Sequence, residues 1–429
     1  MPNLLTINDL KVVFRSGQDL TSAVDGISLH LSPGETLGIV GESGSGKSVT
    51  ALSIMRLLNA SPGTETSGEI WFQSPRQPQA VDLLQLPEAQ LQAFRGAEIA
   101  MIFQEPMSSL NPVFRCGHQV TEAIQLHQKV DFATAKAQTL ALFERVKLPD
   151  PDRIFRAYPH QISGGQKQRV MIAMAMSCQP ALLIADEPTT ALDVTVQKTI
   201  LDLMRDLREE RNLSMLFISH DLGVISEICD RVVVMYQGTI VESGTVAQIL
   251  QQPQHPYTRG LVACRPSLQH RLRRLPTIGD FLGEQVFDTQ IVTPTENRAR
   301  QADLSAQAPL LKVENLTVRY PARKNWLGQP TAWLNAVEDV SFDVYPGETF
   351  GLAGESGCGK TTLGRTIARL TPAYKGEIWY QDQNLLALDP TAFRPFRREI
   401  QVVFQDPYSS LNPRMTIGDA IVEPMQVHR

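Results

Sequence analysis

The sequence predicts an α/β fold that occurs twice along one chain, and two repeated patterns support this prediction. A short apolar, β-type run, a glycine-rich loop and a segment with helical spacing recur, with the loops at Gly41–Ser48 (GESGSGKS) and Gly354–Thr361 (GESGCGKT). A later segment, MIFQEPMSSLNP at Met101–Pro112, recurs as VVFQDPYSSLNP at Val402–Pro413. Repetition of this kind indicates duplicated domains, and the strand–loop–helix order is typical of α/β units with a parallel sheet.

Length and composition are consistent with two folded domains. The chain has 429 residues, of which 42% are hydrophobic and 20% charged, as in ordinary globular proteins. The formal net charge of −5 argues against a large nucleic-acid-binding surface, which is usually basic. No apolar run approaches the roughly 18–20 residues that cross a bilayer, and the N-terminus lacks a signal-peptide pattern. We therefore expect any membrane role to come through a partner.

The two glycine-rich loops match the pattern GxxxxGK[ST], which binds nucleotide phosphates. Glycines let successive N–H groups turn toward phosphate, and the following helix adds its positive end. Lys47 is expected to reach the β- and γ-phosphates of ATP, and Ser48 to hold Mg²⁺. A plain surface loop is the alternative, and two matches in the same context disfavour it. The predicted nucleotide-binding residues are Gly41, Ser43, Gly44, Gly46, Lys47 and Ser48, and in the second loop Gly354, Ser356, Gly357, Gly359, Lys360 and the metal-binding Thr361.

Acidic and histidine residues follow two further apolar runs of the first copy. Leu182–Ala185 ends in Asp186 and Glu187, and a carboxylate at the end of a buried strand is costly unless it has a task. Asp186 suits a Mg²⁺ ligand and Glu187 a general base or water-orienting group. His220 follows another β-like run and could hold the attacking water, although a lone histidine is more often structural.

Two weaker signals concern a helix start and two aromatic residues. The sequence Ser163-Gly-Gly165-Gln precedes an Ala- and Met-rich helical segment, so its N-terminus could bind an anion; an ordinary helix cap is the alternative. Phe14 and Tyr320 precede their loops and could stack on adenine, although Phe14 could equally pack in a strand core.

Taken in order, the glycine-rich loop, Gln104, SGGQ, Asp186-Glu187, Ala191-Leu192-Asp193 and His220 resemble the ABC ATPase family over nearly the whole chain. The resemblance implies P-loop NTPase domains with a parallel-sheet core, an antiparallel β portion and a helical subdomain carrying SGGQ. It also implies that ATP lies between the P-loop of one domain and the SGGQ of another. Gln104 and its counterpart Gln405 would lie near the γ-phosphate, with Gln104 also at the metal and facing a membrane partner. Ile162, where leucine is commoner, is a conservative departure.

The resemblance divides the chain into three parts. Residues 1–264 are expected to form the first nucleotide-binding domain with a C-terminal extension, 265–309 a linker, and 310–429 the N-terminal part of a second domain. Only 24 residues follow Gln405, so the second copy is expected to be truncated, without signature, acidic pair or switch histidine. Neither intramolecular site would then be complete, and first copies from two chains could pair as a homodimer.

Some segments point to one branch of the family. YPHQISGGQKQRVMIAMA at Tyr158–Ala175 and HPYTRGL at His255–Leu261 resemble bacterial importers of dipeptides, oligopeptides, glutathione or nickel. Two domains in one chain most resemble the glutathione-importing members. This resemblance implies ATP hydrolysis coupled to uptake, with two integral-membrane permeases and a periplasmic or surface solute-binding protein as partners. The chain would lie peripherally at the cytoplasmic face of the bacterial inner membrane.

Two other functions stay open at this stage. A soluble tandem ABC ATPase acting on ribosomes or DNA would also lack membrane spans, but we would expect a long, charge-dense helical linker that residues 265–309 do not show. The ATPase of an ABC exporter is the other alternative. Some importers carry a cysteine cluster in the extension, whereas this chain has only Cys264 there. We predict no iron–sulfur cluster, and the scattered spacing of all the cysteines predicts no zinc site or disulfide framework; they are Cys116, Cys178, Cys229, Cys264 and Cys358.

Overall fold

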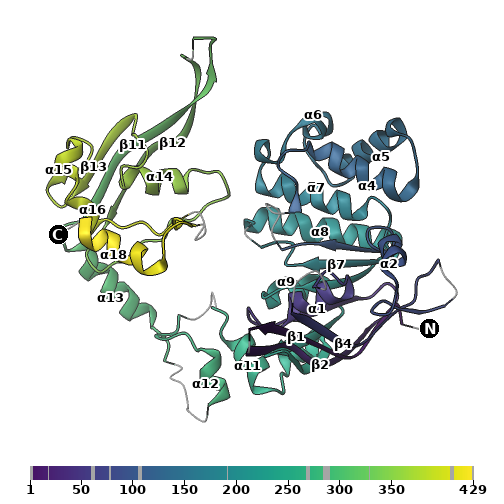
Figure 1. Cartoon of the computed structure of the whole chain (residues 1–429). Coiled ribbons are helices and arrows are strands. Elements are labelled where there is room, and N and C mark those ends of the chain that lie inside the picture. The colour runs from purple at the N-terminus through teal and green to yellow at the C-terminus, as the bar shows by residue number, and fades with distance from the viewer. Residues whose placement is uncertain are drawn as a thin grey trace. The chain divides into compact units, whose positions relative to one another are not determined.

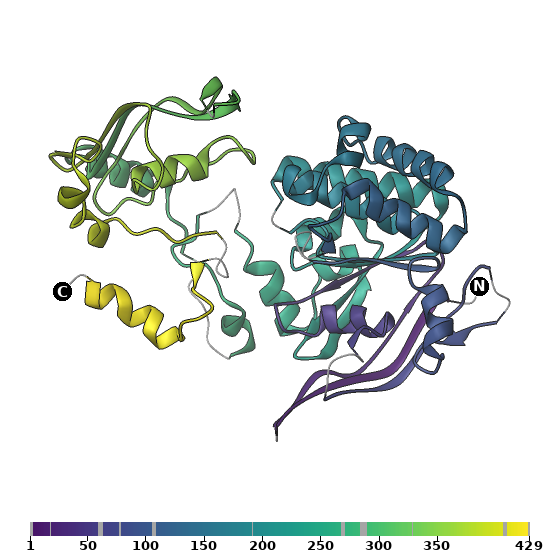
Figure 2. The same ribbon diagram turned by 45° about the horizontal axis from the view of Figure 1, so that its top comes forward.

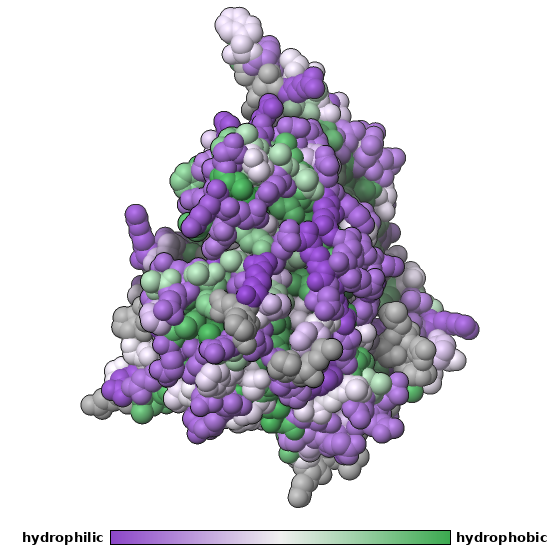
Figure 3. Space-filling view, turned by 90° about the vertical axis from the view of Figure 1, so that its right-hand side faces the viewer, coloured by the Kyte–Doolittle hydropathy of each residue, from purple (hydrophilic) through white to green (hydrophobic). Residues whose placement is uncertain are grey.

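The protein is described by a computed structural model that covers residues 3–17, 19–58, 63–76, 79–104, 109–190, 192–266, 271–283, 290–327, 329–405 and 410–427. The chain divides into two compact units, Met1–Ile291 and Val292–Arg429. No helix among the described residues is long and apolar enough to cross a membrane. The face drawn in Figure 3 is mainly hydrophilic, with small hydrophobic patches between the polar side chains.

An antiparallel sheet begins the first unit, with strand order β2-β1-β4-β5. Leu5 in β1 pairs with Leu31 in β2 on one side and with Phe72 in β4 on the other, and all three side chains are buried. The strands β1 and β2 form a hairpin with a short connection, whereas β2, β3 and α1 lie between β1 and β4 in the sequence. The bounds are Leu5–Ser16 for β1, Asp19–Leu31 for β2, Thr64–Phe72 for β4 and Val81–Asp82 for β5.

A six-stranded sheet with order β10-β9-β3-β8-β7-β6 forms the centre of the first unit. Its strands are parallel from β9 to β6, and β10 pairs antiparallel with β9. Every residue of β3, β7 and β8 is buried, as in parallel strands covered on both faces. The bounds are Thr36–Val40 for β3, Ile99–Ile102 for β6, Leu182–Asp186 for β7, Ser214–Ile218 for β8, Arg231–Tyr236 for β9 and Thr239–Thr245 for β10.

Two hydrophobic cores cover the two faces of this sheet. One contains buried residues of the antiparallel sheet and of α1 (Lys47–Ile54) and α2 (Glu88–Phe94). The other contains buried residues of the helical part that follows β6, where Figure 1 draws α4 to α7 together. These helices are α4 (Cys116–Gln128), α5 (Phe132–Arg145), α6 (Pro151–Arg156), η2 (Pro159–Gln161), α7 (Gly164–Met176), α8 (Val194–Arg211), α9 (Leu222–Ile228), α10 (Val246–Gln251) and α11 (Pro256–Ala263). The predicted fold class is thus confirmed, including its antiparallel and helical portions.

The second unit repeats the antiparallel sheet, in the order β12-β11-β13-β14. Its core includes Val313, Leu316 and Ile378, with Leu363 of α14 packed against them. Figure 2 shows these strands beside α14, and α18 near the C-terminus. The bounds are Leu311–Lys324 for β11, Pro330–Val344 for β12, Lys375–Tyr380 for β13, Gln383–Asn384 for β14, Lys360–Ile367 for α14, Pro390–Phe393 for α15, Phe396–Glu399 for α16 and Ile417–Val427 for α18.

Two helices lie in residues 265–309, for which the sequence predicts a linker: α12 (Ile278–Leu282) and α13 (Pro294–Ser305). Thr293 caps α13 in a capping box with Glu296, which is a helix start signal. Neither helix has a buried residue. The absence of an apolar face explains why no hydrophobic periodicity marks α13 in the sequence.

Candidate functional site

The first glycine-rich loop joins β3 to α1, and two of its glycines are required by the backbone. Gly46 has φ 99°, and a Cβ there would lie 2.5 Å from the carbonyl oxygen of Ala23. Gly41 has φ 156°, and a Cβ would lie 2.2 Å from the carbonyl oxygen of Met235. A larger residue would therefore push the loop away from the strands that hold it.

Lys47, the first residue of α1, folds back under this loop and is only 5% exposed. Its Nζ donates to the carbonyl oxygens of Gly41 at 2.8 Å and Glu42 at 2.7 Å, and to Ser45 Oγ at 3.3 Å. Burial lowers the pKa of Lys47, although the charges of Glu187 and Asp186 oppose this shift. A buried ammonium of this kind is well suited to an anionic ligand.

Ser48 and Asp186 bring two oxygens together beside Lys47. Ser48 Oγ donates to Asp186 Oδ1 at 3.1 Å, and Asp186 is 4% exposed at the end of β7. Burial is the main cause of the raised pKa of Asp186. Hydroxyl and carboxylate oxygens are the ligands that Mg²⁺ prefers, usually one or two of them completed by phosphate oxygens and water. The pair Ser48 and Asp186 is therefore a small donor set of the kind that binds Mg²⁺ together with a nucleotide.

Three side chains meet at one oxygen of Glu187. Its Oε2 accepts hydrogen bonds from Thr190 Oγ1 at 2.8 Å and Gln104 Nε2 at 3.2 Å, and lies 3.1 Å from His220 Nδ1. Burial alone would raise the pKa of Glu187, but hydrogen bonds from Thr190 and His220 and the charges of His220 and Lys47 outweigh it and lower the pKa. The result is a carboxylate that stays ionised at neutral pH.

The structure thus gathers Gln104, Lys47, Ser48, Asp186, Glu187 and His220 at one edge of the sheet. The carboxyl ends of β3, β7 and β8 meet there, the usual binding edge of a parallel sheet. Thr190 was not predicted. A turn places it there, because the Thr190 N–H donates to the Glu187 carbonyl oxygen at 3.2 Å. Its spacing of three residues from Glu187 is the only signal of this in the sequence.

Ser163 and Gly165 lie at the start of α7, a helix that is drawn with α4, α5 and α6 in Figure 1. Ser163 Oγ accepts from the N–H of Gln166 at 3.3 Å, and Gln166 Oε1 accepts from the N–H of Ser163 at 3.1 Å. This reciprocal pair is a capping box. The structure does not bring the SGGQ segment to the phosphate loop of its own unit.

The predicted aromatic residues have different environments in the two units. Phe14 is half-buried against the core of the antiparallel sheet, whereas Tyr320 on β11 is 41% exposed. No interaction of either aromatic ring indicates an adenine site. Ala191 lies outside the described residues, as do residues 105–108 of the Gln104 segment.

The second glycine-rich loop has the same lysine contacts in a more exposed setting. Lys360 Nζ donates to the carbonyl oxygens of Gly354 and Glu355, both at 2.6 Å. Gly359 has φ 101°, and a Cβ there would meet the Ala336 carbonyl oxygen at 2.1 Å. Most of this loop is exposed, namely Gly354, Ser356, Gly357 and Cys358, together with Thr361 and Gln405.

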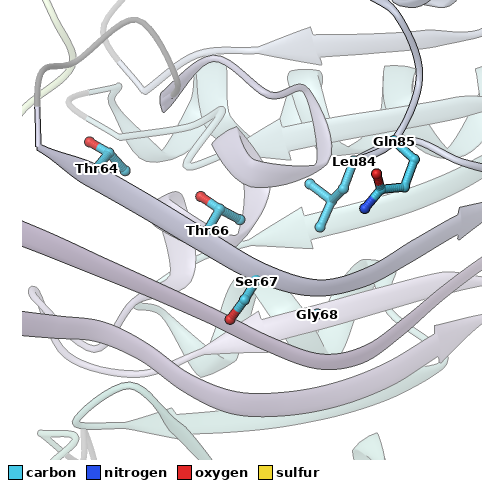
Figure 4. A pocket seen from close by; sticks show the side chains of 6 residues that line it. All are labelled: Thr64, Thr66, Ser67, Gly68, Leu84 and Gln85. Carbon is cyan, nitrogen blue, oxygen red and sulfur yellow. The ribbon is translucent and has the colours of Figure 1, made fainter.

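A cavity of about 580 Å³ lies elsewhere, along β4 and the turn that follows β5 (Figure 4). None of its lining residues carries a charge, so it does not suit an anionic nucleotide. They are Thr64, Thr66, Ser67, Gly68, Leu84 and Gln85.

Comparison with known proteins identifies the family. Residues 24–190 and 337–428 match the ABC transporter family, and residues 241–284 match the oligopeptide/dipeptide transporter C-terminal region. The chain is 47% identical to the glutathione import ATP-binding protein GsiA of Escherichia coli (strain K12), over 99% of this chain and 68% of that protein. The chain belongs to the ATP-binding proteins of the ABC transporter family. GsiA of Pectobacterium atrosepticum is 46% identical over 99% of this ABC protein and 67% of the relative.

Solved structures agree with the fold of this ABC ATPase. The dimeric structure of the ATP-binding cassette MJ0796 in a post-hydrolysis state bound to ADP and Pi matches with a TM-score of 0.50 and 24% identity, covering 56% of this chain and 98% of that one. A second dimeric structure of MJ0796 matches with the same values. Because this chain belongs to the ABC transporter family of ATP-binding proteins, it is an ATPase.

Proposed function

We propose that this ABC ATPase couples ATP hydrolysis to the uptake of glutathione or another small peptide through two membrane permeases and a solute-binding protein. The observation that carries the catalytic part is the meeting of Gln104, Thr190 and His220 at one oxygen of Glu187. The relatives named for glutathione import and the match of residues 241–284 support the solute class. That same match favours an importer over a ribosome- or DNA-acting ATPase or an exporter.

The first phosphate loop would bind the triphosphate of ATP. Its N–H groups and the start of α1 would face the phosphates, and the buried ammonium of Lys47 would exchange its carbonyl partners for β- and γ-phosphate oxygens. Ser48 and Asp186 would hold Mg²⁺, whose charge offsets that of the phosphates. In the second unit Lys360 and Thr361 would take the corresponding roles.

Glu187 would act on the water that attacks the γ-phosphate. Because its carboxylate is ionised, it can accept a proton or a hydrogen bond from that water. His220 and Gln104 would hold the same carboxylate oxygen in place and lie near the γ-phosphate. Both side chains would therefore influence the orientation of the attacking water.

A complete site would need the SGGQ segment of another unit, because Ser163 in this unit contacts its own helix. We propose that first units of two chains can pair, so that Ser163 and Gly165 of one face Lys47 of the other. The total rate of ATP hydrolysis should then rise more than linearly with protein concentration, so that specific activity increases across a dilution series. High activity that does not depend on concentration would contradict this pairing.

The test of solute class is uptake in a strain that lacks the gene. Loss of labelled glutathione or dipeptide uptake, restored by the wild-type gene but not by Lys47→Ala, is the expected result. Normal uptake of these solutes with loss of nickel uptake would instead assign the protein to the metal-importing branch.

At the peripheral, cytoplasmic position that we propose, Gln104→Ala should reduce uptake more than the ATPase activity of the isolated subunit. Equal losses would leave Gln104 a role in chemistry alone.

A further inference from the structure

The C-terminal extension contacts the phosphate loop through one tyrosine. Tyr257, near the start of α11, is fully buried. Its ring packs against Tyr236, the last residue of β9, with 4.3 Å between ring centroids. Its hydroxyl accepts a hydrogen bond of 2.9 Å from the backbone N–H of Glu42 in the loop. The residues HPYT thus do more than mark a branch of the family.

The backbone that carries Tyr257 is itself held in place. Glu242 on β10 accepts hydrogen bonds from the N–H groups of Gln254 at 2.8 Å and His255 at 3.0 Å. His255 caps α11, with its Nδ1 accepting from the N–H of Tyr257 at 3.2 Å. The tyrosine hydroxyl is therefore presented by a fixed turn and not by a mobile side chain.

The bonded N–H belongs to the same peptide group that carries one of the Lys47 contacts. The carbonyl oxygen of Gly41 accepts from Lys47 Nζ at 2.8 Å, while the N–H on the other side of this peptide is held by Tyr257. Because a peptide group is planar, fixing its N–H also fixes the direction of its carbonyl. Burial raises the pKa of Tyr257, so the hydroxyl keeps its proton at neutral pH.

We propose that Tyr257 is a positioning residue that anchors the Gly41–Glu42 peptide and so places the phosphate loop and Lys47 for ATP. This inference rests on the proposed binding of ATP by that loop. It makes the C-terminal extension a support of the nucleotide site. The extension would then act on the ATP site of its own unit as well as through contacts outside the ATPase domain.

The second phosphate loop has the same lysine contacts as the first. Lys360 reaches the two corresponding carbonyl oxygens. The folded-back lysine is therefore common to both loops. We therefore expect Tyr257 to affect the affinity of the first loop for nucleotide.

The test is Tyr257→Phe in the full chain, which keeps the buried ring and removes the hydroxyl. Loss of a partner for a partly buried N–H should weaken ATP binding and raise KM about five- to twentyfold, with kcat within about twofold. The Glu42 amide should also exchange its hydrogen faster. Tyr236→Phe is the matched control: its hydroxyl accepts from the exposed Gln237, and its removal should leave Kd and KM unchanged.

Several outcomes would overturn the inference. Unchanged ATP affinity in Tyr257→Phe, or a fall in thermal stability without a change in KM, would leave the hydroxyl a purely structural role. A fall in kcat alone would also exclude anchoring of the loop. If the variant folds poorly, hydrogen exchange at Glu42 in the wild-type chain still decides, because an unprotected amide contradicts the bond. A wild-type chain that does not bind ATP would instead overturn the proposed function itself.

Discussion

The two copies have similar, largely apolar residues before their phosphate loops but fold them differently. TLGIV at Thr36–Val40 is the fully buried strand β3. TFGLA at Thr349–Ala353 forms no strand and is exposed, with Leu352 at 47%. The same contrast separates β6 from Gln401–Phe404, where Val403 is 98% exposed. By comparison, the antiparallel sheets of the two units have the same strand order.

The difference shows where each kind of strand finds its partners. β3 pairs with β8 and β9, which follow it by well over a hundred residues, and the described part of the second unit has no strands in those positions. The antiparallel strands β1 and β2 form a hairpin, and β1 also pairs with β4, for example Leu5 with Phe72. A hairpin needs a short connection, whereas parallel strands need crossovers. The antiparallel sheet is thus built from strands of the first part of each copy, whereas the partners of β3 come from a later part of the first copy.

The largest expected effect tests whether hydrolysis belongs to the first unit. Glu187→Gln should keep ATP binding but lower single-turnover hydrolysis about 10²- to 10⁴-fold, because it removes the group that acts on water. Glu209→Gln, on the exposed end of α8, is the control and should match the wild type. Wild-type turnover in Glu187→Gln would exclude Glu187 as the group that acts on the attacking water. It would also weaken the assignment of hydrolysis to the first unit.

The next prediction tests the fold contrast itself with a matched pair. Ile39 is fully buried in β3, so Ile39→Ala should lower the free energy of unfolding of the first unit by about 2–5 kcal/mol. Leu352→Ala, at the corresponding exposed position of the second copy, should change the free energy of unfolding of the second unit by less than about 0.5 kcal/mol. Chemical denaturation monitored separately for each unit makes the measurement. Equal losses would mean that TFGLA is packed as a strand in solution.

A third comparison concerns the two lysines. Lys47→Ala should weaken ATP binding at the first loop about tenfold or more, because its buried ammonium makes a charge-assisted phosphate contact with little screening. Lys360 lies in an exposed loop, so Lys360→Ala should change affinity there less than about threefold. Equilibrium binding of a fluorescent ATP analogue to both variants measures the two effects. A larger loss for Lys360→Ala would reverse the assignment of the stronger site.

The smallest expected effect concerns the pKa of Glu187 and its hydrogen bond from Thr190. Its folded-state pKa is lowered, so its ionised form stabilises the fold above the ordinary carboxyl pKa, and this contribution is lost as the pH falls through the folded value. Thr190→Val removes a donor and should move the acid limb of ATP hydrolysis to higher pH. At neutral pH the rate should fall about twofold or less, because the carboxylate remains ionised. Thr190→Ser should restore the wild-type profile, and an unmoved acid limb in Thr190→Val would contradict the assigned bond.

The main site residues could be predicted because each follows an apolar run that becomes a parallel strand. Lys47, Asp186 and His220 then meet because the carboxyl ends of such strands share one edge. Tyr257 could not be assigned a role in this way, because its partner lies in a loop 215 positions earlier. The helix α13 escaped prediction because it buries no residue, and hydrophobic periodicity is the signal that sequence analysis uses.

At the position before Gly46 and Gly359, the two loops differ by one atom, the oxygen of Ser45 against the sulfur of Cys358. Ser45 is buried under the first loop, whereas Cys358 presents an exposed thiol in the second, 3.5 Å from Lys360 Nζ. Among the other thiols, Cys116 and Cys178 are buried, and Cys229 and Cys264 are partly covered. An alkylating reagent should therefore modify the second loop first. The rate of that modification, and its slowing by nucleotide, would report occupancy of one copy without interference from its near twin.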